Sequence, residues 1–310
     1  MNRGSRFLSV LCLWMVGILS TPLLADEVEH CKSDKKYNVA ICALFKNEES
    51  YLKEWIEYHK LIGVEHFYLY DYGSKDRSSD VLGPYIREGS VTLIHWLNGF
   101  FNQDLENSEH WVFAVQLTAY ENAAKFRAVQ ETEWLAFLDI DEYLVPIHAN
   151  TIGEVLQSYE SHPGVQLTSN FFDASHIDVL PKRELLIATT ELTAPPEKNI
   201  QRSVEKVIFK PEMHTTVVWP PYRCNFKDDR IAPRLSKGEL RINKYVNRSR
   251  GSVYFGKKKE RLHIDNRMLT DKEAGDLLEI GFEIEDREKA IYRFESELKK
   301  KMGVQTGWNW

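Results

Sequence analysis

Residues 134–146 read Trp-Leu-Ala-Phe-Leu-Asp-Ile-Asp-Glu-Tyr-Leu-Val-Pro, and this stretch decides the fold. Its first five residues are apolar on both faces, which predicts a strand buried from both sides, as in the centre of a parallel sheet. The strand runs directly into three carboxylates, Asp139, Asp141 and Glu142. In open α/β sheets, ligands bind in the crevice beyond the carboxyl ends of the strands. The stretch therefore predicts a parallel sheet with a candidate site at its edge.

The three carboxylates need a cation or hydrogen-bond donors, because an unpaired buried carboxylate is strongly destabilising. On an extended segment, Asp139 and Asp141 point the same way and Ile140 points back into the core. Hard oxygen ligands of this kind suit Mg²⁺ or Mn²⁺, which in turn suit a phosphate-bearing substrate. An acidic turn at a strand end, or a pair of helix-capping aspartates, is the alternative interpretation.

The composition is that of an ordinary globular protein. The chain has 310 residues, of which 43% are hydrophobic and 12% aromatic, enough for a large core. Its net charge of −6, from 40 basic and 46 acidic residues, argues against a nucleic-acid partner, because nucleic-acid affinity depends on neutralising phosphates. The sequence contains neither the glycine pattern of a dinucleotide fingerprint nor that of a phosphate-binding loop.

The N-terminus has the pattern of an export signal. Two arginines precede an uncharged stretch, residues 7–24, and acidic residues follow it. This charge order predicts that the chain beyond the stretch is translocated. Cleavage after Ala25 and retention as a membrane anchor both fit, since the stretch is just long enough to span a bilayer. We expect residues 1–25 to be a signal peptide or signal anchor and residues 26–37 a spacer. The protein is then exported or lumenal, and it contacts a membrane only if this segment is not cleaved.

Downstream, strands and helices alternate. Strands are predicted at 38–45, 66–70 and 91–96, and a long helix at 108–130 precedes the acidic strand. Alternation at this spacing predicts a parallel sheet with right-handed crossovers.

The second half of the chain is less regular. Its predicted strands lie at 165–172, 206–211, 215–219 and 240–246, and a helical pattern rich in charge returns at 270–301. The expected fold class is α/β, with a Rossmann-like, mostly parallel sheet, helices on both faces, and an irregular, partly antiparallel C-terminal region.

The first predicted helix has a start signal and one apolar face. Asn47 can cap it, and the glutamates that follow suit its first turn. Leu52, Trp55 and His59 fall on one face of this helix. We therefore interpret His59 as a core histidine rather than a ligand.

Several motifs in a fixed order resemble those of glycosyltransferase family 92. They are KNE at 46–48 with YL-x-EW at 51–55, HFYLYD at 66–71, VLGPYIREGSV at 81–91, FLDIDEYLVP at 137–146, KVIFKP at 206–211 and RINKYVNRSRGSVYFGKKKE at 241–260. The resemblance implies a nucleotide-sugar transferase of the GT-A type, with a D-x-D metal site between two halves. It places the nucleotide-sugar-binding half at 38–146 and the acceptor half, with its closing helix, at 147–310.

The resemblance also implies roles for individual residues. Asp139 and Asp141 would hold a divalent cation, Mn²⁺ or Mg²⁺, at the donor phosphates, and Glu142 would ligate or orient it. Four residues match positions that cradle the nucleoside: Lys46, Asn47, Glu48 and Asp71. Helix capping is the alternative for Asn47 and Glu48, and Asp76 is interpreted as a cap or turn residue.

The implied activity is metal-dependent, inverting transfer of a hexose, with galactose as one option, from a nucleotide-sugar donor to a glycan or glycoconjugate acceptor. Inversion needs one general base near the acceptor hydroxyl. Asp173 is the first candidate because it follows the next strand after the metal site, and Asp228 and Asp229 are the alternatives. His176 matches a family position that would bind acceptor or phosphate. A non-catalytic carbohydrate- or nucleotide-binding protein on the same scaffold is the alternative function.

The sequence departs from the family pattern at two histidine positions. Family members usually carry histidine where this chain has Lys244, and again near Trp219. A histidine there would be a third metal ligand, for which His214 and His263 are the possible replacements. A protonated lysine cannot ligate a metal, but its ammonium can pair with a diphosphate as a point charge.

Overall fold

The computed structural model describes residues 34–96, 112–173, 184–189, 191–193, 206–218, 223–247, 263–264, 267–268 and 290–304. All of them belong to one compact unit, Ser33–Trp310. The predicted signal segment, His176 and the predicted helix up to residue 289 lie outside the described residues. Within the described part of the chain, no helix is long and apolar enough to cross a membrane.

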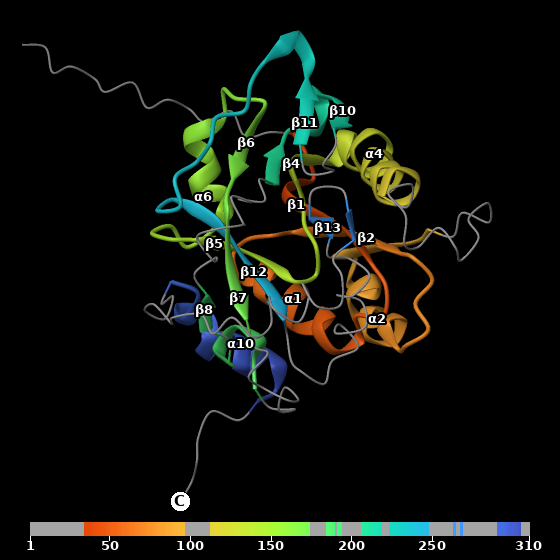
Figure 1. Cartoon of the computed structure of the whole chain (residues 1–310), viewed down its shortest axis with the longest axis vertical. Helices are drawn as coiled ribbons and strands as arrows, with labels where there is room; N and C mark the ends of the chain where they lie inside the picture. The colour runs from red at the N-terminus through yellow and green to blue at the C-terminus, as the bar shows by residue number, and fades with distance from the viewer. Residues whose placement is uncertain are drawn as a thin grey trace, which may run out of the picture. The chain divides into compact units, whose positions relative to one another are not determined.

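A six-stranded sheet with the order β3-β2-β1-β4-β9-β6 forms the centre of this unit. Figure 1 labels its strands β2, β1, β4 and β6. Its parallel strands are β1 (Tyr37–Phe45), β2 (His66–Asp71), β3 (Val91–His95) and β4 (Thr132–Phe137). Two strands from later in the chain, β9 (Lys206–Phe209) and β6 (Gly164–Leu167), extend it in antiparallel orientation. The predicted mostly parallel α/β sheet is confirmed.

Both faces of this sheet are covered by helices. Val39, Ile41 and Ala43 of β1 pack in one core cluster with α1 (Glu49–Leu61) and α2 (Ser78–Glu88). The alternate residues of β1 pack in a second cluster with the helical stretch 112–131. Because side chains alternate along a strand, a run that is apolar at every position is the signature of a sheet covered on both sides.

The helix predicted at 108–130 is continuous from residue 112 but mixed in type, and residues 108–111 lie outside the described part of the chain. It consists of the π-helical segments η2 (Val112–Leu117) and η3 (Ala123–Ala128) with α4 (Thr118–Asn122) between them and α5 (Val129–Glu131) at its end.

A second sheet has the order β5-β12-β7-β8. Its strands are β5 (Glu142–Pro146), β12 (Leu240–Asn247), β7 (Ser169–Asp173) and β8 (Glu191–Thr193). β12 is antiparallel to β5 and parallel to β7, and β7 is antiparallel to β8. The predicted partly antiparallel second region is thereby confirmed.

The remaining elements are short. They are α6 (Ile152–Leu156), η4 (Gln157–Tyr159), α7 (Leu186–Thr189), η5 (Pro211–Met213), β10 (His214–Val218), β11 (Arg223–Phe226), η6 (Lys227–Asp229), β13 (His263–Ile264), β14 (Arg267–Met268), η7 (Ile291–Phe294) and α10 (Glu295–Met302). Leu298 of the closing helix α10 is buried in the same core cluster as α1.

The single strand predicted at 165–172 is wrong. The chain forms β6 in the first sheet, leaves it at Thr168, and enters the second sheet as β7. Both pieces carry buried apolar side chains, so an apolar run that crosses between sheets resembles one strand.

The two sheets also interleave along the chain. β6 and β9 follow residue 146 yet belong to the first sheet, while β5 precedes residue 147 and belongs to the second. The division at residue 146 stays a prediction about the roles of the two halves.

Candidate functional site

Three loops meet at the carboxyl edge of the first sheet because β2, β1 and β4 are parallel neighbours. The last residue of β1, Phe45, pairs with Asp71 at the end of β2, and Cys42 pairs with Phe137 at the end of β4. The loops that follow these strands therefore emerge side by side, where open α/β sheets bind ligands.

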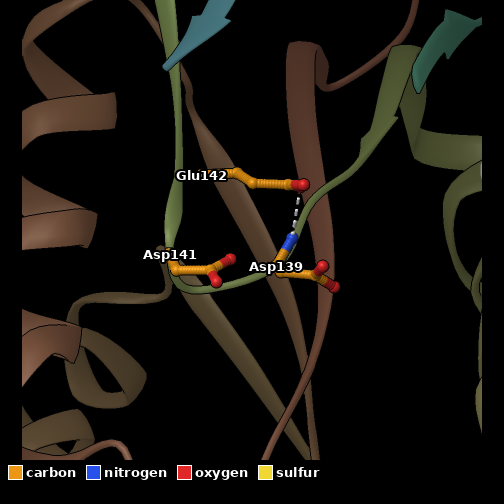
Figure 2. A group of neighbouring side chains, drawn as sticks. All are labelled: Asp139, Asp141 and Glu142. Atoms are coloured by element: carbon orange, nitrogen blue, oxygen red, sulfur yellow. Dashed lines mark hydrogen bonds between the residues drawn. The ribbon is translucent and has the colours of Figure 1, made fainter. Parts of the chain in front are cut away.

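The three acidic residues form one cluster in the turn between β4 and β5. Oxygen atoms of Asp139, Asp141 and Glu142 lie within 4.8 Å of one another. The Glu142 N–H donates to the Asp139 carbonyl at 3.0 Å. The Asp139 N–H donates to Glu142 Oε2 at 2.9 Å, and Figure 2 shows this second bond. We call residues 139–142 the acidic turn.

The predicted clustering and the burial of Ile140 are confirmed, but the segment is a turn rather than extended. The pair of reciprocal bonds to Glu142 closes the backbone over four residues. Asp141 therefore reaches toward Asp139 from the other arm of the turn, as Figure 2 shows.

Two lysines neutralise most of the charge of the acidic turn. Lys244 Nζ lies 2.8 Å from Glu142 Oε1, 3.2 Å from Asp139 Oδ2 and 3.6 Å from Asp141 Oδ1. Lys206 Nζ lies 2.8 Å from Glu142 Oε2 and 3.6 Å from Asp139 Oδ2. Three carboxylates and two ammonium groups leave a formal charge of −1, counted as 3 negative less 2 positive.

Strand pairing places both lysines. Lys244 is the direct partner of Glu142 in the antiparallel pair of β12 and β5, so the two side chains share one face of that sheet. The Tyr245 N–H donates to the Asp141 carbonyl at 2.8 Å, which joins β12 to the turn itself.

Lys206 begins β9, which runs antiparallel to β4 with Ala136 opposite Ile208. Two residues further along, this register brings Lys206 to the end of β4, beside Asp139. Lys206 is absent from the residues predicted from the sequence. Only the order of strands in the sheet places it here, and a local sequence pattern does not contain that order.

Side chains of helix α1 form hydrogen bonds with the backbone of the acidic turn and of β5. The indole N–H of Trp55 donates to the Glu142 carbonyl, and the Tyr58 hydroxyl donates to the Leu144 carbonyl, both at 2.8 Å. His59 Nδ1 lies 2.8 Å from the Trp55 carbonyl, and His59 Nε2 accepts from the Leu144 N–H at 3.3 Å. These partners assign the proton to Nδ1, and burial lowers the pKa of His59 to about 3. The prediction of a satisfied core histidine is confirmed.

The acidic turn fits a divalent metal in part. Asp139 and Asp141 supply hard oxygen donors close enough to share one ion. Glu142 fits the orienting role rather than that of a ligand, because Lys244, Lys206 and the Asp139 N–H already engage its two oxygens. Lys244 also contacts the two aspartates, so a shared ion would take its place.

The predicted nucleoside-binding residues form a second, locally bonded group. The backbone N–H of Asn47 donates to Ser74 Oγ at 2.9 Å, and Asn47 Oδ1 accepts from the Lys75 N–H at 2.7 Å. Asp71 Oδ1 accepts from the Ser74 N–H at 2.8 Å. The ammonium of Lys46 lies 5.2 Å from the centre of the Tyr72 ring. The loops after β1 and β2 are thus joined, and we call residues 46–48 and 71–76 the paired loops.

The capping role expected for Asn47 is wrong. Glu48 occupies the N-cap position of α1 without a capping side-chain bond, and Asn47 has a left-handed backbone with φ 56°. Asp76 takes the role instead. One of its oxygens accepts from the Glu49 N–H at 2.9 Å, and the other accepts from the Ser78 N–H at 3.1 Å and from its hydroxyl. The prediction that Asp76 is a cap is confirmed.

The candidate general bases are spread over other elements. Asp173 ends β7, two residues beyond Phe171, which is the strand partner of Lys244. Asp228 and Asp229 are exposed in η6. The general base, and the role of His176, stay predictions.

The histidines considered as replacement ligands are not brought to the acidic turn by any described contact. His214 is buried at the start of β10, with Nε2 3.8 Å from Glu121 Oε2 and its ring against Phe209. His263 is the first residue of β13.

Residues 35–222 match the family model "Glycosyltransferase family 92", which is more than half of the chain. A glycosyltransferase family 92 protein of Oryza sativa subsp. japonica is 26% identical over 216 residues, covering 68% of this chain and 33% of that protein. One of Ricinus communis is 27% identical over 229 residues, covering 72% and 38%. A galactan beta-1,4-galactosyltransferase of Arabidopsis thaliana is 32% identical over 144 residues, covering 44% and 27%. The chain spans about a third of the length of these curated relatives.

Solved structures are similar at a lower level. S. aureus TarS 1–349 in complex with UDP aligns with a TM-score of 0.39 and 12% identity, covering 67% of this chain and 60% of that one. Glucosyl-3-phosphoglycerate synthase from Mycobacterium tuberculosis, in complex with Mn²⁺, UDP and glucosyl-3-phosphoglycerate, aligns with a TM-score of 0.32 and 14% identity, covering 87% and 82%. Scores this low assign no detail of this chain.

Proposed function

The chain belongs to glycosyltransferase family 92, and from this premise we propose that it transfers a sugar from a nucleotide-sugar donor to a carbohydrate acceptor. The observation that carries the proposal is the acidic turn, with its two lysines, at the carboxyl edge of a parallel sheet. Because the Arabidopsis relative is a galactosyltransferase, galactose is the first donor sugar to test.

The donor would lie across the paired loops and the acidic turn. The paired loops are joined by hydrogen bonds within the protein itself, so they offer a preorganised surface for the nucleoside. Asp139 and Asp141 would hold a divalent metal, Mn²⁺ or Mg²⁺, at the diphosphate, and Glu142 would orient the turn by accepting the Asp139 N–H. The metal would stabilise the charge that develops on the departing nucleoside diphosphate.

Transfer with inversion is part of the proposal. It requires a base that takes the proton from the acceptor hydroxyl as that oxygen attacks the anomeric carbon, with no covalent sugar–enzyme intermediate. Asp173 is the proposed base because β7 runs beside β12, the strand that carries Lys244. Export to the secretory lumen or beyond, through the N-terminal segment, completes the proposal and would place the enzyme where glycan acceptors are found.

Hydrolysis of a panel of nucleotide sugars, beginning with UDP-galactose, UDP-glucose and GDP-mannose, with water in place of the carbohydrate acceptor and nucleotide release as the readout, tests the proposal. The wild-type protein should release nucleotide in the presence of Mn²⁺, and Asp141→Asn should reduce the rate by about 100-fold or more while the melting temperature stays close to that of the wild type. Asp80→Asn, on the exposed surface of α2, is the matched control and should keep the full rate.

The alternative function gives a different result in the same experiment. A non-catalytic binding protein would bind a nucleotide sugar, as seen by calorimetry, without releasing nucleotide. Absence of both binding and release across the panel would overturn the proposed function.

A further inference from the structure

Lys244 occupies the position that a shared metal ion would need. Its ammonium lies 3.2 Å from Asp139 Oδ2 and 3.6 Å from Asp141 Oδ1, the two carboxylates that fit a divalent ion. A divalent cation on the same oxygens would lie next to this positive charge and be repelled by it. The ammonium and the metal therefore compete for one place.

The two lysines that contact the acidic turn differ in how far their side chains are buried. The side chains of Lys206 and Glu142 are 1% and 0% exposed, so this ion pair is sealed inside the fold. The side chains of Lys244 and Asp139 are 15% and 18% exposed, so this side of the cluster reaches solvent. If Lys244 turns away, Glu142 keeps Lys206 and the Asp139 N–H as partners. Departure of Lys244 thus leaves the fully buried Glu142 with two donors, and it removes the ammonium from the two aspartates that would bind the metal.

The charges favour an exchange once a diphosphate is present. Without Lys244, three carboxylates and Lys206 carry a formal charge of −2, counted as 3 negative less 1 positive, which one divalent ion neutralises. A diphosphate offers the ammonium of Lys244 a new anionic partner, and the flexible four-carbon stem of lysine lets it follow. The same diphosphate offers additional oxygen ligands to the metal.

We propose that Lys244 keeps divalent metal out of the acidic turn until a nucleoside diphosphate takes over its ammonium group. Metal and nucleotide then bind cooperatively, and by linkage each raises the affinity for the other by the same factor. In the free protein, Lys244 pairs with the aspartates and excludes the metal. In the complex, it binds the diphosphate. The nucleotide half of this inference rests on the proposed function, whereas the exclusion of metal by Lys244 does not.

Mn²⁺ binding to the full chain, measured by electron paramagnetic resonance or calorimetry with and without UDP or GDP, tests the exchange. In the wild type, nucleotide should raise the affinity for Mn²⁺ by about 10-fold or more. Lys244→Met should bind Mn²⁺ alone about 10-fold more tightly than the wild type. Nucleotide should raise its Mn²⁺ affinity by a smaller factor than in the wild type, because the diphosphate still offers oxygen ligands but no longer has an ammonium group to remove. Lys244→Arg keeps the positive charge and should behave like the wild type, and Lys299→Met, on α10, controls for the loss of any lysine.

Two outcomes would overturn the exchange: an unchanged Mn²⁺ affinity in a folded Lys244→Met, or equal Mn²⁺ affinity in the wild type with and without a nucleotide that binds. Lys244→Gln repeats the first comparison if the methionine variant fails to fold. If neither UDP nor GDP binds under any metal condition, the proposed function has failed. The nucleotide-free comparison of the lysine variants still decides whether Lys244 excludes the metal.

Discussion

The acidic turn and the paired loops lie at the same edge of the same sheet but are held in different ways. In the paired loops, the bonds that join Asn47 to Ser74 and Lys75 span 27 and 28 residues, within one strand–helix–strand unit. In the acidic turn, the bonds from Lys244 to Asp139 and Glu142 span 105 and 102 residues. One half of the candidate site is therefore complete when the first two strands have paired. The other half is complete only when the second sheet has formed.

Removal of Lys206 should have the largest effect, because it breaks the distant half at its most buried point. Lys206→Met leaves Glu142, which is 0% exposed, with one fewer cation. Breaking a buried ion pair on one side costs about 3–5 kcal/mol, so the free energy of unfolding should fall by about 3 kcal/mol, given the donors that Glu142 keeps. Urea denaturation measures this change.

Lys206→Met combined with Glu142→Gln is the informative partner, because it removes both charges. Part of the lost stability should return in this double variant if the unpaired carboxylate is the cause. A loss below about 1 kcal/mol in the single variant would show that Lys206 does not anchor the acidic turn.

Helix α1, which supports the acidic turn, contains a buried neutral histidine whose contribution to stability depends on pH. Burial lowers the pKa of His59 to about 3, from an ordinary value near 6.5, so the unfolded chain binds a proton that the folded protein does not. The contribution of His59 to stability is therefore present above pH 6.5 and is lost as the pH falls toward 3.

Glu54, on the same helix, contributes to stability with the opposite pH dependence. Burial raises the pKa of Glu54 to about 7. Hydrogen bonds that its carboxylate accepts from the backbone N–H groups of Leu186 and Ile187 lower the pKa, but by less. Its contribution is present below about pH 4.5 and is lost as the pH rises through 7. Between pH 4.5 and 6.5 the two slopes offset each other.

His59→Gln should remove the pH dependence of stability that His59 causes and leave the one that Glu54 causes. The free energy of unfolding of this variant should fall by about 2–3 kcal/mol as the pH rises from 4.5 to 6.5, since one proton over two pH units corresponds to about 2.7 kcal/mol. The wild type should change by less than half of that over the same range. Chemical denaturation at several pH values measures both curves. Parallel curves for the two proteins would contradict the neutral, buried state of His59.

The same contrast explains what the sequence could predict. The strand before Asp139, the helix face of Leu52, Trp55 and His59, and the clustering of the three carboxylates depend on local periodicity and order, and all of them were predictable. The closing of the acidic segment into a turn was not, since an extended segment was predicted. Lys206 reaches the turn only because β9 is inserted antiparallel beside β4, and the split of 165–172 depends on which sheet has room for each piece. Those choices belong to the tertiary structure. Asn47 was predicted as a helix cap, but its side chain accepts from the Lys75 N–H instead. Asp76, 27 residues along the chain from Glu49, accepts from the helix N-terminus, and a local pattern does not contain that contact.

Asn47 offers the smallest and most local test. Asn47→Ala removes the acceptor of the Lys75 N–H and places alanine at φ 56°, so we expect a loss of about 2 kcal/mol, as the sum of one hydrogen bond and left-handed backbone strain. Asn47→Gly accepts this backbone conformation and should lose only the hydrogen-bond part, about 1 kcal/mol. Because the paired loops are complete without the second sheet, neither variant should change the Mn²⁺ affinity of the acidic turn. A change in Mn²⁺ affinity in folded Asn47→Gly would show that the two halves of the candidate site are coupled, and the contrast between them would then fail at the site itself.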